Sequence, residues 1–232
     1  MSSKEATGIL DRSIAATAGT ERDMLPSRLD MAAFEPALST DLARFKDPPW
    51  QAALDVPRAL SIISADSTIA GMFFLGILDG AKRRGVTLAG ARERYLAFNF
   101  YPVAEFAPLL IAAAGLFHPT LSLRQALRAM GAAGPAVLAK SVLGKVTLGS
   151  AIGVHAVIDA IANTYAVNIR PSRCAVTHRA ARACIVSLDN VQYFVDSHHI
   201  GVFEGTMTHG GVAGRVRIAT RSEFSAELLL EW

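Results

Sequence analysis

Histidines, serines and cysteines carry most protein chemistry, and few of them are suitably spaced in this 232-residue chain. His198 and His199 are adjacent, so their side chains diverge on a helix or a strand and, with His209, do not suit a zinc site. Ser150 lies in Gly-Ser-Ala-Ile-Gly, which only echoes the GxSxG motif of a serine nucleophile. No phosphate-binding loop, dinucleotide fingerprint or HExxH motif occurs. We therefore expect a protein that is not an enzyme and holds no metal.

A binding site for a small molecule is the remaining positive interpretation. Apolar pockets with a few polar anchors are the usual ligand sites. The candidate ligand-binding residues are Tyr101, Arg124, His155 and Arg173. Aromatic residues either line such a pocket or simply fill the core, and these are Phe98, Phe100, Tyr101, Phe106, Phe117 and Tyr165.

The charge is unevenly distributed along the chain, although the net charge is only +3. Residues 106–188 contain one acid, Asp159, and eight bases: Arg124, Arg128, Lys140, Lys145, Arg170, Arg173, Arg179 and Arg182. Such a segment either attracts an anionic ligand, nucleic acid or an acidic partner, or pairs with the acidic ends of its own fold. Residues 170–182 could neutralise phosphates, but they lack aromatic residues for base stacking, so nucleic-acid binding is not favoured.

Composition and targeting signals place the chain among ordinary globular proteins. A hydrophobic content of 51% excludes a wholly disordered chain. Residues 106–123 are uncharged and just long enough for a membrane span, but Pro108, His118 and Pro119 interrupt them. No signal peptide is visible, and Cys174 and Cys184 are expected to be reduced core thiols. We expect a soluble, cytoplasmic protein.

The hydrophobic pattern predicts helices in the first two thirds of the chain. Residues 1–57 are rich in proline and charge and are interpreted as a variable N-terminal extension with short helices. Residues 58–232 are expected to form a single domain. Ser122 is expected to cap a helix, and Gly134-Pro135 to end it. The expected helices are residues 69–84, a segment from about Ala89, residues 104–117, 123–133 and 137–146, and a last one from near Ser150 to Tyr165.

The pattern changes to short strands after residue 170. Residues 173–178 and 183–188 are predicted to form a hairpin, and residues 215–220 and 226–232 a second antiparallel pair. A helix over residues 200–208 separates the two pairs. The predicted fold class is therefore α+β, with an N-terminal helical subdomain followed by a small antiparallel sheet with one inserted helix.

Five phrases occur in an order that is shared with a known family. They are Ala70-Gly71-Met72-Phe73-Phe74, Tyr101-Pro102, residues 127–131, Gly201-Val202-Phe203-Glu204-Gly205, and a last strand that ends in Trp232. Residues 58–232 thereby resemble an uncharacterised paralogous family of myxobacteria, a domain of unknown function. That family looks like a distant relative of the haem-nitric-oxide/oxygen-binding domain and of the vinyl-4-reductase ligand-binding domain.

The resemblance implies a fold rather than a mechanism. The haem domain needs an axial histidine on a helix, and His155 lies in the helix before the sheet, as that ligand would. The haem domain also holds the propionates with a Tyr-x-Ser-x-Arg stretch, which this sequence lacks, so no cofactor is expected.

The leading functional hypothesis is a non-enzymatic sensory or regulatory module that binds a small apolar or anionic molecule. The alternative is a protein-interaction or scaffold module without a ligand, acting with a protein partner or as a homodimer. Binding to nucleic acid through the basic strip is a third, weaker hypothesis, and no membrane partner is expected.

Overall fold

Helices come first along the chain and the larger sheet comes last, which confirms the predicted α+β class. The computed structural model describes residues 41–140 and 142–232. Most of the predicted N-terminal extension lies outside the described residues. Its described part begins with a short 3-10 helix, η2 (Asp41–Arg44), whose Leu42 is buried, as is the following Phe45.

Two antiparallel sheets organise the helices. The smaller sheet has the order β2-β1-β3, and the larger has the order β4-β5-β7-β6. The described helices are α2 (Val56–Ser61), α3 (Gly71–Arg83), α4 (Val103–Phe117), α5 (Leu123–Lys140), α6 (Val142–Thr147), α7 (Val154–Asn168) and α8 (His198–His209). The described strands are β1 (Thr68–Ala70), β2 (Phe100–Pro102), β3 (Ile169–Arg170), β4 (Arg173–Ala180), β5 (Ala183–Asp189), β6 (Arg215–Ser222) and β7 (Ser225–Glu231).

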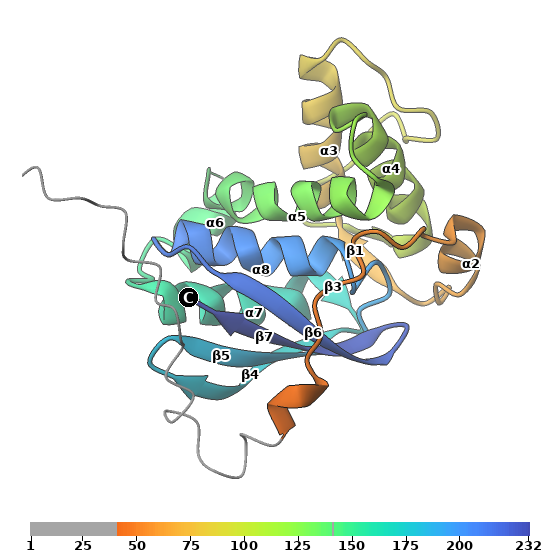
Figure 1. Ribbon diagram of the computed structural model, residues 1–232. Coiled ribbons are helices and arrows are strands. Elements are labelled where there is room, and N and C mark those ends of the chain that lie inside the picture. The colour runs from red at the N-terminus through yellow and green to blue at the C-terminus, as the bar shows by residue number, and fades with distance from the viewer. Residues whose placement is uncertain (1–40, 141) are drawn as a thin grey trace, which may run out of the picture. The chain divides into compact units, whose positions relative to one another are not determined.

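The helices are stacked in layers on one face of the larger sheet. Figure 1 shows α7 and α8 between the sheet and α5, with α3 and α4 beyond α5 and the short η2 against the other face. The inner side chains of β5 and β7, such as Val186 and Leu228, join the helices in one core and are fully buried. No helix within the described ranges is both long enough and apolar enough to cross a membrane.

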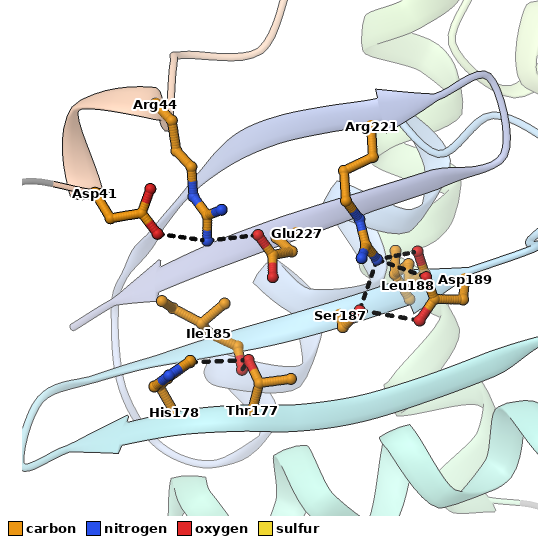
Figure 2. Close-up of polar contacts among 10 residues, drawn as sticks. All are labelled: Asp41, Arg44, Thr177, His178, Ile185, Ser187, Leu188, Asp189, Arg221 and Glu227. Carbon is orange, nitrogen blue, oxygen red and sulfur yellow. Dashed lines mark hydrogen bonds and ion pairs between the residues drawn. The ribbon is translucent and has the colours of Figure 1, made fainter. Parts of the chain in front are cut away.

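The opposite face of the sheet carries paired polar side chains (Figure 2). Arg44 of η2 contacts Glu227 of β7 at 2.6 Å and Asp41 at 3.2 Å. Arg221 of β6 donates to Ser187 Oγ at 2.7 Å and to Asp189 Oδ1 at 2.6 Å, both on β5. The Arg221 contacts join two strands and the Arg44–Glu227 contact joins η2 to the sheet, so charged side chains on this face are paired with one another.

Local signals explain several helix ends. At the start of α5, Ser122 N donates to Gln125 Oε1 at 3.1 Å and Gln125 N donates to Ser122 Oγ at 3.4 Å, a reciprocal capping box that confirms the predicted cap. Lys82 and Arg83 occupy the last turn of α3, where cations oppose the helix dipole. Gly85 then adopts a φ of 70°, which terminates the helix as glycine commonly does.

Three predictions of secondary structure are wrong. Residues 84–99 form turns instead of a helix, because the Arg92–Glu105 ion pair and the stacking of Tyr95 on Phe74 fix an irregular path. α5 continues through Pro135, because its packing against α8 outweighs the lost backbone hydrogen bond. α7 begins at Val154 rather than near Ser150.

The smaller sheet was not predicted at all. Its strands are two or three residues long, and β1 is paired on both sides, with Ile69 opposite both Tyr101 and Ile169. Strands this short carry no periodic signal that a sequence can reveal. The sheet ties together the segments that precede α3, precede α4 and follow α7.

The backbones of α5 and α8 are in close contact at three glycines. A Cβ added to Gly131 of α5 would lie 2.0 Å from the His198 carbonyl oxygen. A Cβ added to Gly201 or Gly205 of α8 would lie 1.9 Å from the Arg128 oxygen or 2.1 Å from the Ala132 oxygen. No side chain larger than hydrogen fits at these three positions without moving the helices apart.

We expect Gly201→Ala to lower the free energy of unfolding by roughly 2–4 kcal/mol, because the new methyl group collides with backbone rather than with a flexible side chain. Urea denaturation monitored by circular dichroism measures the effect. Gly134→Ala is the matched control, since Gly134 is in α5 but has nothing within 4 Å of the added Cβ. The control should be neutral or more stable, as alanine favours helix, and equal behaviour of the two variants would contradict the close packing.

Candidate functional site

A shallow cleft of about 250 Å³ lies where four segments distant in sequence meet. One wall is formed by α2 and the residues before it, including Leu54 and Ala59. A second wall is the loop of residues 193–196, which leads into α8, and a third is the β6–β7 turn with Phe224. Arg124, at the start of α5, completes the lining. The cleft is the candidate functional site.

Opposite charges are paired within the cleft lining. The Arg124 guanidinium is ion-paired with Asp196, and its Nε donates to the Ala52 carbonyl oxygen at 3.0 Å. The Arg124 side chain is only 12% exposed, so this pair is partly withdrawn from solvent. Arg58 and Glu223 form a second pair at 2.6 Å that is mostly exposed. The partly buried pair contributes more to the local structure, because an exposed pair is screened by water.

The loop of residues 190–197 has a strained backbone that its hydrogen bonds maintain. Asn190 has a φ of 55° and Phe194 a φ of 42°, and a bulky aromatic residue rarely adopts positive φ. The Phe194 carbonyl accepts from Ser197 N at 3.2 Å, and Val191 N donates to the Phe224 carbonyl at 2.8 Å. Such strain concentrates at functional sites, where surrounding contacts hold it. The strained residue Phe194 lines the cleft.

A buried polar cluster adjoins the cleft at Tyr193. Tyr193 lines the cleft, and its ring lies 4.6 Å, between ring centroids, from the ring of His199. His199 Nδ1 is hydrogen-bonded to the Tyr165 hydroxyl of α7 at 2.8 Å. His199 Nε2 and Ser197 Oγ are buried without a hydrogen-bond partner. Buried polar atoms without partners are rare in proteins. The cluster therefore has two polar atoms, next to the cleft, that could still form hydrogen bonds.

Burial shifts the pKa of each titratable group in this cluster toward the neutral form. Desolvation lowers the pKa of His198 to about 4, opposed by its hydrogen bond to the Leu127 carbonyl. Desolvation is the main cause that lowers the pKa of His199 well below its usual value, and the nearby charge of His198 lowers it further. A hydrogen bond with the Tyr193 backbone opposes this shift. Burial raises the pKa of the Tyr193 and Tyr165 hydroxyls above their usual value. At neutral pH the cluster is therefore uncharged.

The four candidate ligand-binding residues do not form one site. Arg124 alone lines the cleft. Tyr101 lies in β2, where its hydroxyl accepts from Leu96 N at 2.9 Å and its ring packs against Tyr95. His155 lies in the first turn of α7, with its ring edge-to-face on Trp232. Arg173 is exposed at the beginning of β4.

The aromatic residues that line the cleft differ from those named as pocket candidates. Tyr193, Phe194 and Phe224 line it, and the first two of these also belong to the buried core. Phe106 and Tyr165 are buried in the core without lining the cleft, and Phe98 is 71% exposed. The only sequence signal for these cleft residues was the mostly apolar segment 191–195, Val-Gln-Tyr-Phe-Val, between a strand and a helix. That run has no helical or strand periodicity, so its role could not be predicted.

Neither cysteine offers a reactive thiol to the site. Cys174 and Cys184 are free, as expected. Burial raises the pKa of Cys184 to about 12 and that of Cys174 further, which suppresses the nucleophilic thiolate. In the ranges that the structure describes, no three metal-ligating side chains are grouped to hold an ion.

The fold is similar to that of H-NOX domains of known structure. It is similar to the Fe(II) unliganded H-NOX protein from K. algicida, with a TM-score of 0.52 and 13% identity over 70% of this chain and 96% of that one. It is similar to a mutant of the T. tengcongensis H-NOX protein, with a TM-score of 0.52 and 11% identity over 70% and 97% of the two chains. At these identities the likeness concerns the fold alone.

The chain belongs to the family described as "Protein of unknown function (DUF2378)", whose model matches residues 63–232. The match confirms that the chain is part of a family of unknown function, and the likeness to H-NOX domains is a likeness of this chain's fold. The myxobacterial origin and the paralogous character of the family stay predictions. No curated protein matches the chain.

The residues of this chain do not fit haem, which is named for one of the similar solved structures. Haem needs an axial ligand beside a cavity that encloses the macrocycle. His155 packs on Trp232 instead of lining the cleft, and no histidine or cysteine is among the cleft residues that the structure describes. The close contact of α5 with α8 also leaves no gap between those helices.

The neutral histidine pair makes stability depend on pH. Each histidine has a lower pKa in the folded than in the unfolded chain, so its stabilising contribution is complete above pH 6.5 and is lost as the pH falls. For His198 the loss runs from about pH 6.5 to about pH 4, at about 1.4 kcal/mol per pH unit. We expect His198→Gln to reduce the difference in unfolding free energy between pH 7 and pH 5. Urea titrations at the two pH values measure it.

His209→Gln is the matched control, because His209 is an exposed histidine on the same helix. Comparing each variant with the parent protein removes the contribution of the carboxylates. An unchanged pH dependence in His198→Gln would contradict a buried neutral histidine.

Proposed function

We propose that this chain is a non-enzymatic sensory or regulatory module that binds a small molecule in the cleft. The observation that carries the proposal is the combination of aromatic side chains, a withdrawn Arg124–Asp196 pair and a strained Phe194 at one place. Ligand sites combine apolar walls with a few polar anchors in this way. The likeness to H-NOX proteins supports the fold of such a module and not its ligand.

The cleft favours a small ligand with an apolar body and an anionic group. Its volume of about 250 Å³ is below the usual range for drug-sized ligands. Tyr193, Phe194 and Phe224 would contact the apolar body. A carboxylate on the ligand could replace Asp196 as the partner of Arg124, because a guanidinium binds carboxylates in a fixed fork geometry.

Binding would be transmitted through the loop of residues 190–197. Displacement of Asp196 from Arg124 would free the end of the loop, because Asp196 directly precedes Ser197, the N-cap of α8. Because α8 is packed backbone to backbone on α5, a change at its first turn is passed to the second helix rather than absorbed. A ligand shifts such an equilibrium only by its difference in affinity for the two loop positions.

Filling the cleft should abolish ligand binding without unfolding the domain. We expect native mass spectrometry of the gently purified protein to show an extra mass that denaturation removes, and expect Ala59→Trp to lose that mass. Ala59 lines the cleft and is only half-buried, so the indole can occupy the cleft itself. Ala112→Trp, on the exposed face of α4, is the matched control. Bare parent protein under several growth conditions would count against the proposal.

The charge of Arg124 should select carboxylates. We expect a panel of small aromatic and branched aliphatic carboxylates to raise the melting temperature, whereas the corresponding amides should not. Arg124→Gln should remove the preference for carboxylates, and Arg58→Gln, in the exposed pair, should weaken it less. Differential scanning fluorimetry measures all combinations, and equal stabilisation by acid and amide would contradict the role of Arg124.

A further inference from the structure

The larger sheet has two edges, and within the described residues a further segment bonds to only one of them. At the β6 edge, Lys46 N donates to the Ile218 carbonyl and Ile218 N donates to the Lys46 carbonyl, both at 2.8 Å. At the other edge, β4 pairs with β5 and with no further strand of the described chain. The eight residues of β4 therefore present backbone N–H and C=O groups outward, as edge strands do.

The open edge is accessible to another chain. Arg173, Ala175, Thr177, His178 and Arg179 are exposed along β4. Only one face of the strand is covered, by α7. A bulge between Val176 and His178 bends the strand near its middle, where Thr177 Oγ1 donates to the Ile185 carbonyl at 3.3 Å (Figure 2).

The edge is basic, and part of its charge lacks an acidic partner. Arg179 is ion-paired with Asp159 of α7. Arg170 lies over the Phe100 ring at 3.8 Å, and neither it nor Arg173 forms an ion pair with any residue that the structure describes. Asp189 lies opposite Arg173 in the sheet, but it accepts hydrogen bonds from Arg221 and Ser187 instead.

These charges disfavour a second copy of the chain at this edge. Antiparallel pairing of two β4 strands would bring Arg173 of one copy toward the Arg179 end of the other. Like charges across a strand pair are destabilising, whereas opposite charges contribute favourably. An acidic strand would therefore pair here more favourably than a second β4.

We propose that the β4 edge binds an extended acidic segment of a partner protein, which adds a fifth strand to the larger sheet. Backbone hydrogen bonds supply affinity in this mode of recognition, and side chains supply specificity. Glutamate or aspartate at alternate positions would face Arg173 and His178 on the outer face of the sheet. The surface lies on a different strand from those that line the cleft, so this inference is independent of the proposed small ligand.

A synthetic peptide tests the proposal directly. The probe is a capped, fluorescein-labelled peptide of alternating glutamate and valine, equal in length to β4, and fluorescence anisotropy with the full chain measures binding. We expect saturable binding that a lysine–valine peptide does not reproduce. Arg173→Glu should weaken it roughly tenfold, because reversal replaces an attraction by a repulsion. Arg83→Glu, at an exposed arginine of α3, is the matched control and should leave binding unchanged.

Two further arms separate strand addition from simple charge attraction. N-methylation of alternate peptide nitrogens removes donors from one edge of the peptide, so one of the two methylation patterns should abolish binding and the other should not. Equal binding of both patterns would overturn strand addition. A single-stranded oligothymidylate of matched charge tests the alternative that this edge binds nucleic acid. Tighter binding of the oligothymidylate, lost in Arg173→Glu, would overturn the proposal in favour of phosphate recognition.

Discussion

The close contact of α5 with α8 is the constraint on which the other features depend. Gly131, Gly201 and Gly205 bring the two helix backbones together, so each helix fixes the axial position of the other to within a fraction of a helical turn. Close packing of this kind transmits displacement instead of absorbing it. The bidentate Arg128–Glu204 pair, with distances of 2.5 and 2.6 Å, then joins the same two helices at their margin. Its two hydrogen bonds add a directional, charged contact to the backbone contact that the glycines allow.

The cleft follows from this arrangement. Arg124 is one turn before Arg128 on α5, and Asp196 lies just before α8, so the helix contact itself brings the two ends of the Arg124–Asp196 pair together. The loop of residues 190–197 must then span from β5 to a fixed α8. The positive φ angles of Asn190 and Phe194 are how the chain makes that connection. The strain is thus a consequence of two rigid anchors, and one of the two strained residues, Phe194, lines the cleft.

More of the fold than of the candidate site could be predicted from the sequence. Reciprocal capping by Ser122 and Gln125, and the glycine after α3, are local signals that act whatever surrounds them. Pro135 shows the opposite case, since its local tendency to end a helix is overruled by packing that the sequence does not display. Of the candidate ligand residues only Arg124 lines the cleft. Tyr193 and Phe194 were missed because their loop has no periodicity, and only tertiary contacts bring it there.

The uneven charge of residues 106–188 is resolved in part by long-range pairing. Arg124 and Arg128 meet Asp196 and Glu204, acids that lie beyond this segment. The alternative in which acidic parts of the same fold neutralise the basic segment therefore holds for α5. It does not extend to the beginning of β4, where Arg173 has no acidic partner in the described residues and the neighbouring Arg170 rests on an aromatic ring. Arg170 and Arg173 thus leave uncompensated positive charge beside β4, the edge strand to which no further strand of the described residues is paired. Charge on an edge strand disfavours pairing with a second copy of the same strand.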